Sequence, residues 1–237
     1  MDGLKRAAAA LAAFCAFVCM LLSTALTRVT NASLMLEGFN SCAETAAFSV
    51  TPGSYPAYAA MIADYVAGRR DDLTVARADG SVGPAFSERE NAHMADVRAL
   101  VRALGTVRLV TGLLAAAVFL ALLLKRGAID RERRLRDGVR GAAMGAGLFL
   151  LALLCLSIWG LIDFDSLFVA FHRLCFRNDL WLLNPRTDLL LAFMPTRFFT
   201  WYTRRLLLSA LPVLLLAAAL IWAAFRVNRP AEKDPRP

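Results

Sequence analysis

The stretch TVRLVTGLLAAAVFLALLLKRGAIDRERRLRDGVRGAAMGAGLFLLALLCLSIWGLI, residues 106 to 162, decides the fold. Its two ends are apolar runs, at 106–124 and 141–162, and its middle is a short basic segment. A helix needs about 20 apolar residues to cross a hydrocarbon layer about 30 Å thick. Both runs meet that requirement, so the stretch predicts two membrane spans joined by a basic linker.

The rest of the chain predicts two more spans. Of the 237 residues, 58% are hydrophobic, and the mean hydropathy is +0.53, which is unusual for a soluble domain. Further apolar runs lie at 7–26 and 206–226. Lys5 and Arg6 precede the first run, which leaves a cleaved signal peptide as an alternative, but the run is long and no clear cleavage pattern follows it. We therefore expect an all-α membrane protein with four transmembrane helices.

Basic residues predict the topology. The linker 125–140 and the tail 227–237 are both rich in arginine and lysine, so the positive-inside rule places both in the cytoplasm. With 1–26 as the N-terminal tail and first span, segments 27–105 and 163–205 are then extracytoplasmic and form a mostly helical cap. The net charge of +8 is mainly this topology signal, and attraction to anionic lipid follows from it. Nucleic acid is not an expected partner.

The five cysteines predict no metal site and leave one disulfide open. Only Cys42 and Cys175 are expected outside the membrane, where an oxidising exterior permits a bond if the distance allows it. The sequence contains no CxxC pair and no cluster of histidine and cysteine. No metal or other cofactor is expected.

The segment 27–105 has the composition of a folded unit. Its MIADYVAGRR stretch, 61–70, predicts a short helix closed by Gly68. The TVA triplet at 74–76, followed by an Asp-Gly turn, predicts either a small hairpin or a loop. Ser87 and Glu90 form a capping box, so a second helix is expected to begin there.

An apolar stripe marks one face of this second helix. Its members recur at helical spacing: Met94, Val97, Val101 and Leu104. His93 borders the stripe, and either Glu90 or Asp96, three residues to each side, is close enough to orient the imidazole. An exposed histidine beside solvated acids is the alternative for this segment alone. A bend at Gly105 would then lay the helix along the membrane surface.

The segment 163–205 is amphipathic and strongly aromatic. Ser166 is expected to cap a short helix that carries His172, and Asn184 with Pro185 is expected to begin another, at 186–194. Three phenylalanines fall on or near one face of the first helix: Phe164, Phe168 and Phe171. A belt of aromatic side chains at the headgroup level is expected from Phe198, Phe199, Trp201 and Tyr202.

The only two histidines, His93 and His172, fall on the same side of the membrane in this topology. Histidine is the side chain best suited to proton transfer near neutral pH, so the pair suggests ester or amide chemistry on a lipid. Neither a GxSxG nor an HExxH motif is present. On these residues alone, a histidine-dependent lipid enzyme and a non-catalytic membrane protein both stay open.

Two stretches resemble the signature regions of a known family. FSERENAHMADVRAL at 86–100 and LFVAFHRLCFRNDLWLLNPRTDLLLAFMPTRFF at 167–199 are similar to those of the bacterial lipoprotein intramolecular transacylases. This resemblance implies four spans with an extracellular cap in the bacterial cell membrane, and it implies that both histidines are catalytic. The chain departs from the family pattern at Cys175, where an aromatic residue is usual, and at Thr196, where an acid is frequent.

The resemblance also implies a reaction and a partner. Family members move the sn-2 acyl chain of a diacylglyceryl lipoprotein to the α-amino group of its N-terminal cysteine, which gives a lyso-form lipoprotein. The residues expected to bind this substrate are Phe171, Trp181, Asp96, Arg173, Asn178 and Asp179. A non-catalytic lipid-interacting scaffold and a histidine-dependent lipid esterase are the alternatives.

Overall fold

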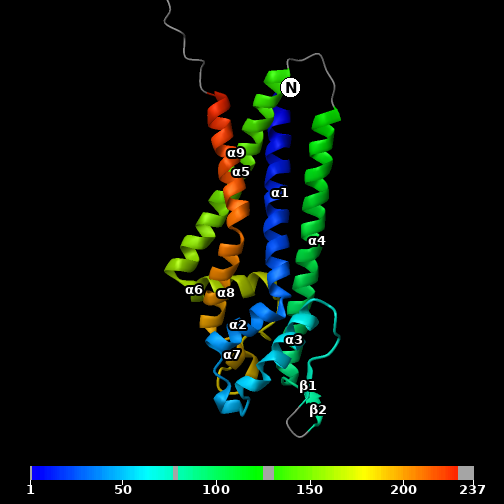
Figure 1. The fold of residues 1–237 in the computed structure, drawn as a ribbon, viewed down its shortest axis with the longest axis vertical. Coiled ribbons are helices and arrows are strands. Elements are labelled where there is room, and N and C mark those ends of the chain that lie inside the picture. Colours follow the sequence, from blue (N-terminus) through cyan, green and yellow to red (C-terminus); the bar gives the residue numbers. More distant parts are fainter. Residues whose placement is uncertain (1, 77–79, 125–130, 229–237) are drawn as a thin grey trace, which may run out of the picture. The chain divides into compact units, whose positions relative to one another are not determined.

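A computed structural model of the chain describes residues 2–76, 80–124 and 131–228. These residues form two compact units (Figure 1). Unit 1 draws its described residues from Met1–Leu21, Val107–Ser157 and Ala210–Pro237, and unit 2 consists of Leu22–Thr106 and Ile158–Ser209. Both histidines belong to unit 2. Parts of the basic linker and tail on which the topology prediction depends, 125–130 and 229–237, lie outside the described residues.

Unit 1 is built from long helices: α1 (Asp2–Val29), α4 (Glu88–Leu124), α5 (Arg131–Ile162) and α9 (Leu211–Asn228). Its core contains Phe17 stacked on Phe149, with ring centroids 5.4 Å apart. A β-carbon at Gly141 or Gly145 would overlap backbone carbonyls of α1. Glycine therefore lets these two helices approach closely, as in many membrane-embedded helix pairs.

Three described helices are long and apolar enough to cross a membrane, within Gly3–Val29, Glu88–Leu122 and Leu135–Ile162. The pair α8 (Thr196–Ser209) and α9 passes the same test only when the two are counted together. The expected fourth span at 206–226 is thus interrupted at Ala210. Pro212 explains the break, since its ring would clash with the carbonyl four residues earlier. The fold class is a mostly helical membrane protein.

Helix α4 passes through Gly105 without interruption, so the bend expected there is wrong. One interior glycine costs about 1 kcal/mol, which the hydrogen bonds of the flanking turns outweigh. The helix has 37 residues, which gives a length of about 55 Å at about 1.5 Å per residue. Its apolar run at 106–124 is enough to cross a membrane, and the first half, with His93, lies outside that run.

Unit 2 combines short helices with a small hairpin (Figure 1). Its helices are α2 (Ala32–Cys42), α3 (Tyr55–Val66), α6 (Phe164–Cys175), α7 (Leu189–Phe193), α8 and the first half of α4. Single 3₁₀ turns occupy Thr45–Phe48 and Pro52–Ser54. Strands β1 (Thr74–Ala76) and β2 (Val82–Pro84) pair antiparallel with Val75 opposite Gly83, so the hairpin alternative is confirmed. Part of the predicted Asp-Gly turn, 77–79, lies outside the described residues.

An aromatic cluster forms the core of unit 2. Phe193 lies at its centre, with ring centroids 4.6 Å from Tyr58 and 4.7 Å from Phe39. Met94 of the predicted stripe is buried in this core, and Val97 and Val101 pack against it. Phe198 is also a core residue, since it is buried and its ring lies 5.8 Å from that of Phe39. The expected aromatic belt is therefore wrong for Phe198, because core contacts cover it.

Several local predictions hold in unit 2. Gly68 has a φ of +75°, and its N–H bonds to the carbonyl of Tyr65 as the helix closes. Ser87 N–H donates to Glu90 at 2.8 Å, and Glu90 N–H donates to the Ser87 hydroxyl at 3.3 Å, which confirms the capping box. Cys42 and Cys175 are free thiols, so the possible disulfide between them is not formed.

Two helix starts were predicted in the wrong place. Helix α6 begins at Phe164 because Asp163, rather than Ser166, is the capping residue and accepts the Ser166 N–H. Helix α7 begins only at Leu189. The Asn184 side chain instead accepts the N–H of Arg186 in a local turn, which competes with the helix expected there.

Candidate active site

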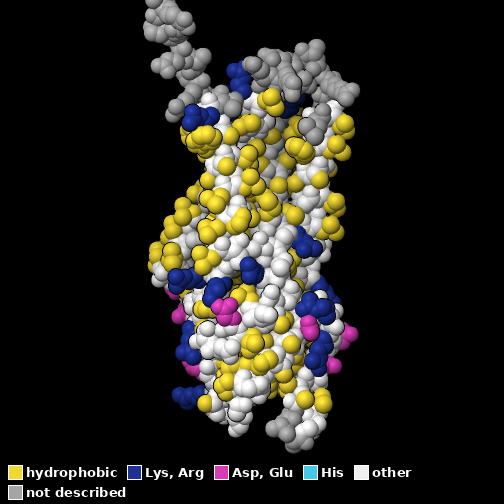
Figure 2. Space-filling model, in the orientation of Figure 1, with side chains coloured by type: hydrophobic (Ala, Val, Ile, Leu, Met, Phe, Trp, Pro, Cys, Tyr) yellow, Lys and Arg dark blue, Asp and Glu magenta, His cyan; other side chains and the backbone are white. Residues whose placement is uncertain are grey.

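Helices α4 and α6 bring the two histidines together inside unit 2. The His93 and His172 ring centroids are 6.2 Å apart, and the rings are tilted by 32°. The exposed fractions are 7% for His93 and 8% for His172, and neither ring is visible on the face drawn in Figure 2. The alternative of an exposed His93 beside solvated acids is therefore wrong.

Aromatic rings surround His172. Phe168 is nearest, with its ring centroid 4.1 Å from that of the imidazole. Trp181 follows at 5.0 Å and Phe171 at 5.3 Å, with the Phe171 ring edge-on. The Phe176 ring lies next to both histidines, with its centroid 5.6 Å from that of His172 and 5.3 Å from that of His93. The imidazole pair thus lies in an apolar, water-poor environment.

A backbone contact orients His172. Its Nδ1 lies 2.7 Å from the carbonyl oxygen of Phe168, one turn earlier on α6. A carbonyl oxygen can only accept, so Nδ1 carries the proton in the neutral ring and Nε2 keeps its lone pair. Burial lowers the pKa of His172 below its ordinary value, and the bond to Phe168 opposes that shift. The His172 ring is therefore neutral near pH 7 with a fixed tautomer, and its Nε2 can accept a hydrogen bond.

His93 has an unsatisfied ring nitrogen. Its Nδ1 is buried and has no hydrogen-bond partner among the described residues. Burial, more than any other cause, lowers the pKa of His93 from 6.5 to about 4; the neighbouring His172 adds to this shift and Asp96 opposes it. A buried polar atom without a partner costs free energy. The atom is therefore available to a substrate group.

Glu90 does not orient His93, contrary to one of the two expectations from spacing. Its carboxylate accepts the N–H of Leu190 at 2.6 Å as well as the N–H of Ser87, and the residue is only 2% exposed. It therefore connects the first turn of α4 to the start of α7. One of its two carboxylate oxygens is already bonded within the predicted capping box.

Asp96 connects α4 to the loop after α6. Asn178 donates its amide N–H to Asp96 at 2.9 Å, and Arg89 donates to the Asp179 carbonyl at 2.7 Å. Together these bonds hold the loop that presents Trp181. The structure thus brings the predicted residues Asp96, Asn178 and Asp179 into contacts that hold this loop against α4.

The sequence of the chain matches a family across most of its length. The model of the lipoprotein intramolecular transacylase Lit family matches residues 10–199. The chain belongs to this family. It is thus a membrane acyltransferase of the Lit type. The enzymes of this family act on lipoproteins.

Solved structures show the same fold. The lipoprotein intramolecular transacylase Lit of Bacillus cereus has a TM-score of 0.66 at 19% identity, covering 95% of this chain and 96% of that chain. Two variants of that protein, with one histidine replaced by arginine or by alanine, each have a TM-score of 0.63 at 20% identity. They cover 95% of this chain and 92% or 94% of their own. No curated protein matches the chain.

Two residues that contact the histidine pair are not among those predicted from the sequence for the site. The sequence places Phe168 only on an aromatic face, and it gives no signal for Phe176. Phe168 could have been found from its position four residues before His172, which places both on one side of a helix. Phe176 lies beyond the end of α6, and its contact with His93 depends on how the chain turns there.

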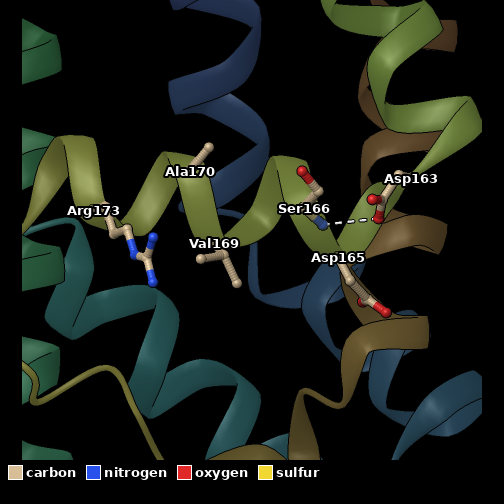
Figure 3. Close-up of a pocket in the computed structure, with 6 residues that line it drawn as sticks. All are labelled: Asp163, Asp165, Ser166, Val169, Ala170 and Arg173. Atoms are coloured by element: carbon tan, nitrogen blue, oxygen red, sulfur yellow. Dashed lines mark hydrogen bonds between the residues drawn. The ribbon is translucent and has the colours of Figure 1, made fainter.

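Arg173 was expected at the site but lies elsewhere. It lines a shallow pocket on another side of α6, together with Asp163, Asp165, Ser166, Val169 and Ala170 (Figure 3). The two carboxylates lie at one end of this pocket and the guanidinium at the other. Neither histidine lines it, so it is not the site of the imidazole pair. Among the described side chains, no three His, Cys, Asp or Glu residues gather as metal ligands.

Proposed function

We propose that this transacylase moves the sn-2 acyl chain of a diacylglyceryl lipoprotein to the α-amino group of the lipoprotein's N-terminal cysteine. The observation that carries this proposal is the buried pair of imidazoles, 6.2 Å apart and enclosed by aromatic rings. One proton acceptor and one hydrogen-bond donor at that spacing can serve the two polar centres of an ester aminolysis.

The aromatic surroundings favour an intramolecular transfer. Ester and amine belong to one substrate molecule, so the enzyme must fold that molecule until the two groups meet. Holding reacting groups in such a geometry can supply roughly 7–11 kcal/mol of the barrier reduction. Phe171 and Trp181 would confine the acyl chain, while Asp96, Asn178 and Asp179 would position the loop and the peptide end of the substrate.

We assign the role of base to His172. The amine nitrogen attacks the ester carbonyl carbon and passes its proton to Nε2 of His172, whose lone pair is directed by the bond between Nδ1 and Phe168. The tetrahedral intermediate then collapses: the bond from carbon to the glyceryl oxygen breaks, and that oxygen takes the proton from His172. One ester and one amine become one amide and one alcohol, so no cofactor is consumed.

His93 would stabilise the developing oxyanion. A pKa of about 4 keeps its ring neutral at pH 7, and a neutral imidazole can donate one N–H bond. Its buried Nδ1 gains a partner when the carbonyl oxygen of the substrate arrives. Donors placed in advance where negative charge develops are among the largest contributions to catalysis.

The location proposed for this reaction is the extracytoplasmic side of the bacterial cell membrane. The basic linker and tail support a topology with both termini in the cytoplasm. Segments 27–105 and 163–205, which hold the two histidines, would then be outside, with spans at 7–26, 106–124, 141–162 and 206–226.

Mass spectrometry of lipoproteins tests the proposal. Purified protein is incubated with a synthetic diacylglyceryl lipopeptide, and the product is fragmented. We expect an unchanged total mass with one acyl chain moved from glycerol to the α-amine. Loss of an acyl chain would instead show an esterase. No change with a folded protein would contradict the proposed reaction.

A further inference from the structure

Helix α6 has a second apolar side, distinct from the one that carries His172. Leu174 on this side is 86% exposed, and Phe171 is 44% exposed. At the end of α5, Leu161 is 86% and Ile162 is 80% exposed. We call these four residues the α6 patch. Figure 2 shows hydrophobic side chains gathered where α5 ends and α6 begins, next to charged ones.

The patch is continuous because the end of α5 packs on α6. A β-carbon at Gly160 would lie 3.0 Å from the side chain of Leu167, which shares a side of α6 with Phe171 and Leu174. The Trp159 indole also donates to the Ser166 hydroxyl at 3.3 Å. Leu161 and Ile162 therefore adjoin the apolar side of α6. Clustered exposed apolar residues usually mark an interaction surface.

The α6 patch is continuous with a candidate membrane span, which indicates that lipid covers the patch. The candidate span Leu135–Ile162 is separated from α6 by one residue, so Leu161 and Ile162 end a helix that is long and apolar enough to cross a membrane. Trp159, partly exposed with its N–H on a hydroxyl, is typical of the membrane interface. Charged Asp163, Asp165 and Arg173 occupy another side of α6 (Figure 3). A short helix with one apolar and one charged side lies in the plane of the interface.

We propose that the α6 patch lies in the lipid of the bilayer and forms the route by which the substrate's acyl chain reaches His172. Phe171 contacts both environments, since its side chain is partly exposed on the patch while its ring and the imidazole are nearly perpendicular, with centroids 5.3 Å apart. An acyl chain can therefore pass from lipid to His172 along one continuous apolar surface. The second part of the proposal rests on the proposed function; the first part does not.

Spin labelling tests where the patch lies. Leu174→Cys and Val82→Cys are each introduced after the five native cysteines are replaced by serine, and the full chain is reconstituted in phosphatidylethanolamine and phosphatidylglycerol vesicles. Val82 is the matched control because it is 70% exposed but lies on the β2 strand. Thermal melting and lipopeptide conversion check that this background resembles the parent; if it does not, the five native cysteines are replaced by alanine instead of serine.

Two paramagnetic reagents report the environment of each spin label: oxygen is enriched in lipid, and a nickel chelate stays in water. Oxygen should increase the spin relaxation rate of the label at 174 more than the nickel chelate does. The label at 82 should show the reverse. Equal behaviour of the two labels would overturn the proposal. A label at 174 that is shielded from both reagents would also overturn it, because a protein partner or a second copy would then cover the patch.

Kinetics test the route. Leu174→Asp should raise the apparent KM for a diacyl lipopeptide in vesicles roughly tenfold, the factor that corresponds to losing the burial of one leucine. The kcat should be retained, Leu174→Phe should restore the KM, and Val82→Asp should leave it unchanged. An unchanged KM in Leu174→Asp, or an equal rise in Val82→Asp, would overturn the route. If the parent converts no lipopeptide, the proposed function fails, and the spin labels still decide whether the patch lies in lipid.

Discussion

Helices α4 and α6 deliver one histidine each, but in different ways. The first half of α4 is anchored along its length: its first turn is tied to α7 through Glu90, and Met94 is buried in the core of unit 2. Helix α6 is short and amphipathic, and much of its apolar surface remains exposed. His93 therefore has a position fixed by protein packing, whereas His172 takes its orientation from the Phe168 carbonyl and its ring neighbours.

The two imidazoles are therefore not interchangeable. His172 has a defined tautomer with a lone pair on Nε2, which suits a base. His93 has a lower pKa, about 4, and a buried nitrogen that lacks a partner among the described residues, which suits a neutral donor. Changes to each helix should therefore have distinguishable effects.

The largest effect should come from removing either imidazole. We expect His93→Ala, His172→Ala and the double variant to lose almost the same activity, because one shared step fails in all three. The activity of each should fall at least about 100-fold. Conversion of a diacylglyceryl lipopeptide measures this, with thermal melting as the check on folding. Mild and additive losses would mean that the histidines act separately, as independent sites do.

Glutamine at each position should separate the two roles. An amide can donate a hydrogen bond but cannot accept a proton at neutral pH. His93→Gln should recover about tenfold over His93→Ala, since a donor is restored to the oxyanion. His172→Gln should stay as inactive as His172→Ala. Recovery at position 172 instead would reverse the assignment.

Val97→Asp should test the anchoring of α4. Val97 packs against the core of unit 2, so a carboxylate there should lower the stability of the unit by about 1–3 kcal/mol and reduce activity by loosening His93. Ala99→Asp, at an exposed position of the same helix, is the matched control. Protease resistance and conversion are compared for both. Full activity and resistance in Val97→Asp would show that the stripe has been misinterpreted.

Replacing the rings around His172 should have a smaller effect. Trp181→Leu and Phe171→Leu each remove an aromatic contact with the imidazole. Each should therefore lower turnover about two- to tenfold. Membrane abundance should be unchanged. Trp222→Leu is a useful control because Trp222 is exposed on α9. If abundance and turnover fall together, the rings serve as membrane anchors instead.

The smallest effect should be on the dependence of stability on pH. The unfolded chain binds a proton at His93 near pH 6.5, and the folded chain does so only near pH 4. Between these values the unfolded state holds more protons, so stability is lost as the pH falls from 6.5 towards 4. The melting temperature should therefore decline less in His93→Gln than in the parent. Identical declines would contradict a lowered pKa for His93.

Local sequence predicted the helices well where one signal dominated. The capping box at Ser87 and Glu90 and the turn at Gly68 depend on residues within about one helical turn, so the pattern was sufficient. The helix predicted from Asn184 failed because that side chain bonds to its own turn, a competition that composition does not resolve. The bend expected at Gly105 failed because one interior glycine costs only about 1 kcal/mol, which the hydrogen bonds of the flanking turns outweigh.

The amino-acid sequence alone was sufficient to predict a helical membrane protein with two histidines in amphipathic segments. Span length and hydrophobic period act along one helix, because transfer into lipid and backbone hydrogen bonds involve residues near one another in the chain. These constraints do not specify which helices meet.

The chemistry available to each histidine depends on tertiary contacts. The contact between His93 and His172, the bridge from Glu90 to Leu190 and the edge of Phe176 against His93 all join distant parts of the chain. Such contacts arise when side chains pack at high density, and each depends on the shape of many neighbours at once. Burial then set the two pKa values apart from that of free histidine, since removing water disfavours the charged ring.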